Sequence, residues 1–227
     1  GGGTVQLQGN QTLIAADDLL ENDVTTLYFD IIYNGDDWTI KNQMFYESYE
    51  NLNENAYGFS QFHDSYVFED KLVFSRIFEG DNLTTSVQLS PSLRYTDFSH
   101  GDDYTNEYFD RRDLTGPSTA LDRRLLATRI DDDYTEYYVG DYMNFGLAAL
   151  VDFTFENGFS ALFGVRWDTV DMESSQPLDK LLFSSSNNFC LDGSCANLNA
   201  SDDQDGISWT ASLSYNSEIG LVPYITV

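Results

Sequence analysis

Residues 83 to 95 read Leu-Thr-Thr-Ser-Val-Gln-Leu-Ser-Pro-Ser-Leu-Arg-Tyr, and this stretch decides the class of fold. Every second residue from Leu83 to Tyr95 is apolar, aromatic or threonine, whereas the residues between them are Thr, Ser, Gln and Arg. Alternation with a period of two places the two sets on opposite faces of a β-strand. The sequence therefore predicts a strand with one apolar face and one hydrated face.

The same alternation recurs along the chain. It is clear in three further segments, residues 142 to 155, 159 to 169 and 207 to 215. It is weaker in four others, residues 24 to 33, 37 to 49, 65 to 78 and 220 to 227. Asp70 and Arg76 interrupt the apolar face of one weak segment. The pattern predicts an all-β protein of about eight strands.

The connections between these strands alternate in length. Four are tight turns, residues 34 to 36, 79 to 82, 156 to 158 and 216 to 220. Three are long, residues 50 to 64, 97 to 139 and 172 to 205. Outer-membrane barrels have tight periplasmic turns and long outer loops, whereas a β-sandwich has no reason to alternate in this way. We therefore predict an antiparallel transmembrane β-barrel with long extracellular loops.

The ends of the chain predict a partial barrel. With tight turns in the periplasm, the strand from Val24 runs inward, so residues 1 to 23 begin outside and Val227 stops partway up an outward strand. An open sheet edge cannot be left in lipid. We therefore expect residues 1 to 227 to contribute about eight strands to a larger barrel.

The composition restricts the partners of the protein. The 227 residues are 41% hydrophobic and 15% aromatic, too rich for a disordered chain, and their formal charge is -27. This charge disfavours nucleic acid and anionic membrane surfaces as partners. The acidic residues either keep a salt-exposed surface soluble or bind divalent cations at a layer of lipopolysaccharide, which with outer-membrane lipid would surround the barrel.

No catalytic constellation stands out. His63 and His100 both fall in predicted outer loops, and the chain has no Walker, H-E-x-x-H or G-x-S-x-G pattern. Cys190 and Cys195 enclose only four residues in a Ser, Asn and Asp-rich segment, for which a loop-closing disulfide is the simplest account. A metal site at these cysteines would need further ligands, and the histidines are distant in sequence. The sequence predicts that the protein is not an enzyme.

Three motifs carry a family resemblance: Gly164-Val165-Arg166-Trp167-Asp168, Ser208-Trp209-Thr210-Ala211-Ser212-Leu213-Ser214-Tyr215 and Gly220-Leu221-Val222-Pro223-Tyr224-Ile225-Thr226-Val227. Their order and spacing resemble the mid-to-late barrel of TonB-dependent receptors, especially siderophore receptors. In that family a strand ending in G-x-R-[YW]-D leads to an outer loop, then to a strand read as S-Y or V-Y, then to P-Y-x-[ST].

The resemblance implies a ligand-gated importer in the outer membrane of a Gram-negative bacterium. Its ligand would be a ferric siderophore or a similar scarce nutrient. A plug domain, absent from this chain, would couple it to the periplasmic energy-coupling protein TonB. Two alternatives stay open: a passive porin or sugar channel, and a surface adhesion or structural barrel.

Candidate ligand-binding residues concentrate in the longest connection and on the hydrated strand faces. They are Arg94, Tyr104, Tyr108, Arg111, Arg112, Arg123, Arg124 and Arg166. Arginine beside tyrosine suits an anionic, planar ligand such as a ferric catecholate, through bidentate hydrogen bonds and cation-π contact. The alternative is that Arg and Asp pair within the loop, and that Arg94, Arg166 and Asp168 form salt bridges to the wall or plug.

Two acidic runs have hard oxygen ligands at short spacing, and they are weak candidates for Ca²⁺ in outer loops. They comprise Asp131, Asp132 and Asp133, and Asp202, Asp203 and Asp205. Neither run completes an EF-hand pattern, so the alternative is solvated surface charge.

Overall fold

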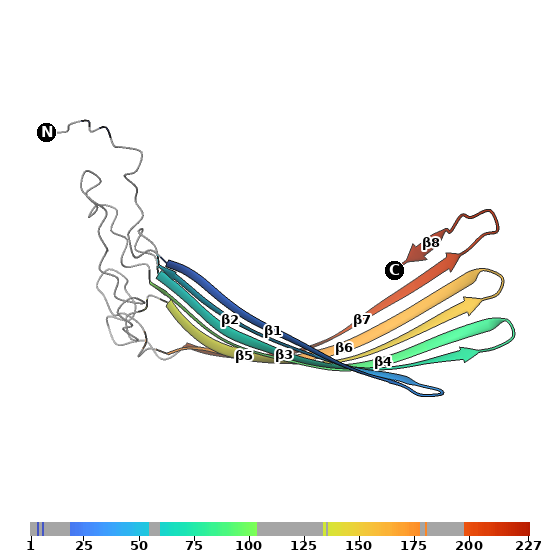
Figure 1. The fold of residues 1–227 in the computed structure, drawn as a ribbon, viewed down its shortest axis with the longest axis horizontal. Helices are drawn as coiled ribbons and strands as arrows, with labels where there is room; N and C mark the ends of the chain where they lie inside the picture. The colour runs from blue at the N-terminus through green and yellow to red at the C-terminus, as the bar shows by residue number, and fades with distance from the viewer. Residues whose placement is uncertain are drawn as a thin grey trace.

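A computed structural model describes the protein, and its described residues form one antiparallel sheet (Figure 1). The described residues are 4, 6, 19 to 54, 60 to 103, 134, 136 to 177, 180 and 198 to 227. Eight strands pair in sequence order: β1 (Leu19–Asn34), β2 (Thr39–Glu54), β3 (Ser60–Glu79), β4 (Leu83–Asp103), β5 (Glu136–Phe155), β6 (Phe159–Gln176), β7 (Leu198–Tyr215) and β8 (Tyr224–Thr226). The predicted all-β antiparallel order is confirmed.

The sheet curves into a trough with a concave and a convex face (Figure 1). Within the described residues its edge strands β1 and β8 do not pair with each other, so the sheet is open. Val73 and Tyr134 are the only buried apolar side chains there, so the sheet has no core packed between two layers. No helix of the described residues is long and apolar enough to cross a membrane.

The tight turns are confirmed, and each is closed by a backbone hydrogen bond. The Gly35 amide donates to the Trp38 carbonyl at 2.9 Å, and the Gly80 amide donates to the Leu83 carbonyl at 3.0 Å. Gly158 has a φ of 89°, a left-handed conformation in which glycine avoids the steric penalty of a Cβ atom. These turns set the register of the hairpins that they join.

The strands run further toward the long connections than the alternation predicts. The strand expected over 83 to 95 continues to Asp103, and the strand expected from residue 207 begins at Leu198. The long connections expected over 50 to 64, 97 to 139 and 172 to 205 therefore begin and end in paired strand. These extensions carry polar residues on both faces, so their sequence shows no alternation. They still pair as strands, because the hydrogen bonds between strands are made by backbone groups. Conversely, β8 is shorter than the expected 220 to 227.

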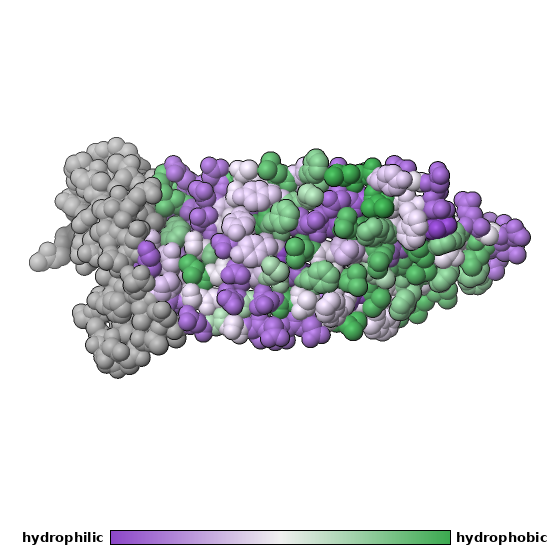
Figure 2. Space-filling model, turned by 90° about the horizontal axis from the view of Figure 1, so that it is seen from below, coloured by the Kyte–Doolittle hydropathy of each residue, from purple (hydrophilic) through white to green (hydrophobic). Residues whose placement is uncertain are grey.

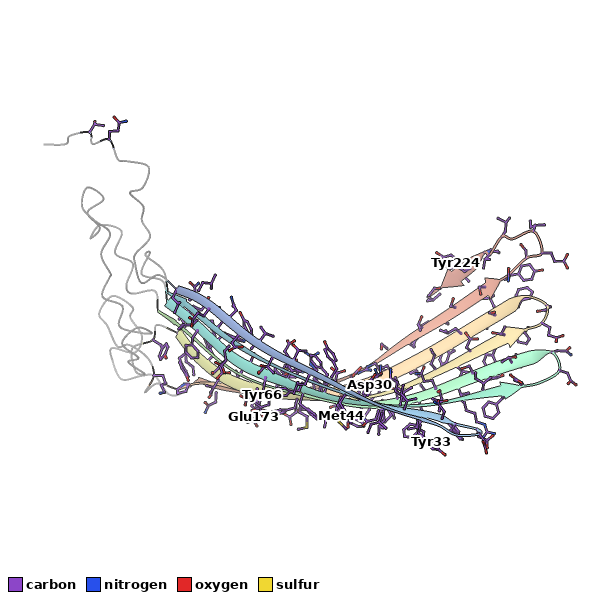
Figure 3. The ribbon with its side chains drawn as sticks, in the orientation of Figure 1. Asp30, Tyr33, Met44, Tyr66, Glu173 and Tyr224 are labelled. Atoms are coloured by element: carbon purple, nitrogen blue, oxygen red, sulfur yellow. The ribbon has the colours of Figure 1, made fainter. Side chains whose placement is uncertain are left out.

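The convex face carries an apolar band between two aromatic belts. Figure 2 shows this face, with hydrophobic residues gathered over the half near the tight turns and hydrophilic ones toward the other end. Near the turns the rings of Phe159 and Tyr215 lie 4.6 Å apart, and on the far side of the band those of Phe145 and Trp167 lie 6.0 Å apart. Aromatic belts mark the two membrane interfaces of an outer-membrane barrel. Figure 3 labels Met44 on this convex side.

The two charges that interrupt the apolar face of β3 both have partners. Arg76 lies near a tight turn, where its guanidinium contacts Asp37 at 2.9 Å and stacks 4.7 Å from the centre of the Phe78 ring. Asp70 accepts a hydrogen bond from the Asn42 side chain on the neighbouring strand. Partnering lowers the cost of placing a polar group on this face, which explains the imperfect alternation.

Candidate functional site

The concave face presents a polar wall that continues across β3 to β7. The register places Ser92, Gly146 and Asp168 side by side in one row, and Arg94 lies opposite Glu69 and Asn144 in the next. These are the hydrated-face positions of the alternation, so the sequence predicts their placement on one surface. A wall of this kind suits the passage of a hydrophilic solute.

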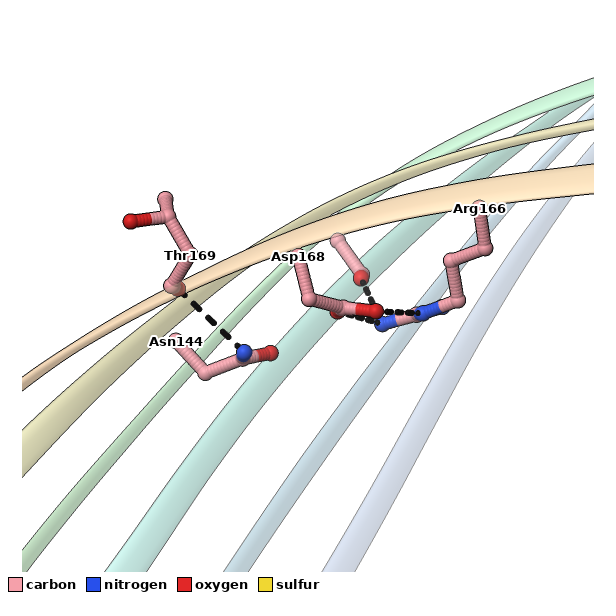
Figure 4. A network of polar contacts seen from close by, with 5 residues as sticks. Asn144, Arg166, Asp168 and Thr169 are labelled. Carbon is pink, nitrogen blue, oxygen red and sulfur yellow. Dashed lines mark hydrogen bonds and ion pairs between the residues drawn. The ribbon is translucent and has the colours of Figure 1, made fainter. Parts of the chain in front are cut away.

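Arg166 and Asp168 form a bidentate ion pair at the centre of the wall (Figure 4). Nε and Nη2 of Arg166 donate to the two carboxylate oxygens of Asp168, each at 2.6 Å. Nη2 also lies 3.4 Å from Oγ of Ser92, and the Asn144 amide donates to the backbone carbonyl of Thr169 at 3.3 Å. The wall salt bridge named as an alternative for these residues is thus present, and it orients the guanidinium.

Gly146 provides the space in which this pair lies. A Cβ atom built at Gly146 would meet Nη2 of Arg166, and would lie 2.7 Å from Oδ1 of Asp168 and 2.8 Å from Oγ of Ser92. All three are tips of side chains, so a substitution would displace the pair without a clash against the backbone. The bidentate contact between Arg166 and Asp168 therefore requires glycine at position 146.

We expect Gly146→Val to destabilise the barrel by about 1 kcal/mol, because the half-exposed pair would lose its bidentate geometry. Chemical unfolding in lipid vesicles measures this loss. The control is the same substitution in an Arg166→Ala, Asp168→Ala background, where Gly146→Val should cost nothing or should stabilise the barrel, because valine favours strands. Equal costs in both backgrounds would show that Gly146 acts independently of the pair.

A hollow in the wall lies beside the pair. Its volume is about 350 Å³ and its lining includes Lys71, Gln88, Ser90, Arg166 and Thr210. The Ser90 hydroxyl is buried and has no hydrogen-bond partner among the described residues. The Lys71 ammonium, with the hydroxyl and amide groups beside it, can bind an oxyanion group such as a carboxylate or a catecholate.

The two histidines lie directly opposite each other, although sequence reasoning placed both in outer loops. His63 is in β3 and His100 in β4, on the concave face beyond the aromatic belt. Their ring centres are 5.7 Å apart, and the Tyr49 ring lies 5.6 Å from His63. Burial, and then the neighbouring His100, lower the pKa of His63.

The sequence did contain the signal for this pairing. The tight turn pairs Glu79 with Thr84, and counting the same number of residues back along both strands brings His63 opposite His100. The prediction was wrong because the strands were ended too early, at residues 65 and 95. Extending the register from the turn between β3 and β4 would have predicted that His63 lies opposite His100.

The acidic residues expected in an outer loop lie in a strand instead. Asp202, Asp203 and Asp205 are in β7, opposite Met172, Asp171 and Thr169 of β6. Asp203 and Asp205 share the convex face, whereas Asp202 projects to the other face. Among the described residues, no group of three or more His, Cys, Asp or Glu is arranged to hold a metal ion. The prediction of a loop was wrong because it relied on the polarity of these residues, although their backbone pairs with β6.

The remaining candidate residues fall outside the described residues, where they stay predictions. They are Tyr104, Tyr108, Arg111, Arg112, Arg123, Arg124, Asp131, Asp132, Asp133, Cys190 and Cys195.

Comparison with known proteins finds one matching family. The family model described as TonB dependent receptor-like, beta-barrel, matches residues 3 to 227. A search of the curated proteins finds no match.

Solved structures share the fold at low sequence identity. The siderophore receptor PiuA from Acinetobacter baumannii is 18% identical, with a TM-score of 0.59 over 92% of this chain and 32% of that one. The ferric-catecholate import receptor Fiu from K12 E. coli is 12% identical, with a TM-score of 0.65 over 93% and 33%. BauA, the ferric preacinetobactin receptor from Acinetobacter baumannii, is 12% identical, with a TM-score of 0.58 over 94% and 31%. The chain spans about a third of the length of these structures.

Proposed function

Because the chain belongs to the TonB-dependent receptor β-barrel family, we propose that it forms part of the wall of a ligand-gated importer. The family comprises outer-membrane proteins of Gram-negative bacteria that act as transporters, not as enzymes. We infer that the remaining strands and a plug domain lie outside residues 1 to 227. Coupling to TonB would act through that plug.

We propose that the imported ligand is a ferric siderophore or a similar anionic chelate. The observation that carries this proposal is the hollow beside Arg166, where Lys71 and the unpartnered Ser90 hydroxyl offer a cation and a hydrogen bond to an oxyanion. The similar solved structures are named as siderophore, ferric-catecholate and ferric preacinetobactin receptors, which supports the same class of ligand.

The experiment is uptake of ⁵⁵Fe-labelled chelates by cells that carry the full-length gene. The host is a strain lacking its own ferric-chelate receptors, grown under iron limitation, with catecholate and carboxylate chelates tested in parallel. We expect uptake of one chelate above the empty-vector level, and its loss to that level when TonB is removed. A TonB-independent uptake would favour a passive channel, and no uptake of any chelate would contradict the siderophore proposal.

A further inference from the structure

The concave end of β3 and β4 brings together the two histidines of the chain. They occupy directly opposed positions on adjacent antiparallel strands, and their ring centres are 5.7 Å apart. Their separation is therefore set by the register of the sheet. A pair of imidazoles on such a scaffold can act as a preorganised ligand set.

The spacing fits coordination of one ion by both rings. A zinc–nitrogen bond is about 2.1 Å, so a bound ion lies about 3.2 Å from the centre of each imidazole ring. Two rings on one tetrahedral ion then have centres about 5 to 6 Å apart. The observed 5.7 Å lies within this interval.

Asp102 holds one of the two rings in an orientation that favours metal binding. Nε2 of His100 lies 3.1 Å from Oδ2 of Asp102, which is buried. This contact retains the ring proton on Nε2 and leaves the lone pair of Nδ1 available. Nδ1 is itself buried, and within the described residues it has no hydrogen-bond partner. A carboxylate, an imidazole and an unpartnered nitrogen form the arrangement that supports metal ligands in proteins.

We propose that His63 and His100 form a two-imidazole site for a transition-metal ion with open coordination positions. Imidazole suits zinc, copper and nickel. Because no third His, Cys, Asp or Glu among the described residues completes a metal site, water or a chelator supplies the other ligands. The ion therefore arrives either free or in a chelate that leaves two positions open. This inference goes beyond the import proposal, since binding requires only the register of β3 and β4.

The test measures copper binding to the full-length protein, purified in detergent without a histidine tag. Free Cu²⁺ and Cu²⁺ iminodiacetate are the two probes, and the readouts are titration calorimetry and electron paramagnetic resonance. We expect a bound copper whose spectrum shows coupling to two imidazole nitrogens. Binding of both probes would identify a partly coordinated chelate as a possible source, whereas binding of free Cu²⁺ alone would identify the ion.

Three variants and a control separate this site from other copper sites. His63→Phe and His100→Phe keep aromatic rings at both positions, and the double variant should lose the two-nitrogen signal. Asp102→Asn should weaken binding about 10- to 100-fold, as expected for a group that orients a ligand. Tyr49→Phe keeps the ring beside His63 and should bind copper like the unaltered protein.

Circular dichroism and heat-modified gel migration establish that each variant is folded, and His63→Gln replaces His63→Phe if the latter fails. The proposal is overturned if the unaltered protein binds no copper, or if the double variant keeps the same affinity and spectrum. Neither result would depend on whether the protein imports a ferric chelate, so the two proposals can fail separately.

Discussion

Replacement of Phe163 by arginine is expected to destabilise the folded barrel by about 2 to 4 kcal/mol, the cost of a basic residue at the bilayer midplane on the lipid face. Phe163 lies on the convex face of β6, midway between Phe159 and Trp167, which belong to the two aromatic belts. Its side chain is 50% exposed in the sheet, so lipid is its main environment. An arginine there would have to reach an interface or remain poorly solvated.

The matched control is Leu162→Arg, one residue away on the concave face. Leu162 lies opposite Asp152 of β5 and Ser212 of β7, so an arginine there would gain a carboxylate neighbour in a hydrated space. We expect its effect on stability to be within about 1 kcal/mol. Guanidinium unfolding in lipid vesicles, followed by tryptophan fluorescence, compares both variants. A larger loss for Leu162→Arg would mean that the two faces are assigned the wrong way round, and equal losses would contradict a lipid face distinct from a hydrated one.

The second large effect is expected for Gly158→Val, which should destabilise the barrel by at least about 2 kcal/mol. Gly158 has a φ of 89°, a conformation that a β-branched residue adopts only with strain. A Cβ atom there would also collide with the backbone carbonyl oxygen of Asn216, which cannot rotate away as a side-chain tip can. The Gly158 carbonyl accepts a 2.7 Å hydrogen bond from the Asn216 amide, so the turn between β5 and β6 is tied to the end of β7.

Gly206→Val is the control for this substitution. Gly206 lies within β7, and a Cβ atom there would have nothing within 4 Å. Valine favours strands and glycine weakens them, so we expect this variant to be more stable by about 0.5 to 1 kcal/mol. The same vesicle unfolding experiment gives the sign of each change. Destabilisation by both variants to the same extent would show that the turn geometry at Gly158 is not special.

Some of the wall could be predicted from residue patterns alone. Alternation from Leu83 to Tyr95 identified the two faces of β4 and placed Arg94 on the hydrated one, and alternation in residues 159 to 169 placed Arg166 on the same face. Salt bridges of Arg94, Arg166 and Asp168 to the wall or plug were expected, and the structure pairs Arg166 with Asp168. What no pattern indicated is that Gly146, on a different strand, makes the room for that pair.

The outer ends of the strands were the main failure of sequence reasoning. The residues from Leu198 to Asp205 are polar on both faces, so they have the composition of a loop although they pair along β6. His63 and His100 were placed in loops for the same reason. Beyond the membrane both faces meet water, and a strand there is specified by its neighbour rather than by its own side chains.

The pattern of residues alone predicts the two faces of the sheet, the tight turns and the antiparallel order. Lipid on one face and water on the other favour side chains of opposite polarity, so polarity alternates from one residue to the next along each strand. The folded sheet shows how far each strand extends, and that Gly146 makes room for Arg166. The register follows from the tight turns, but the polar outer ends of the strands carry no alternation that marks where pairing stops.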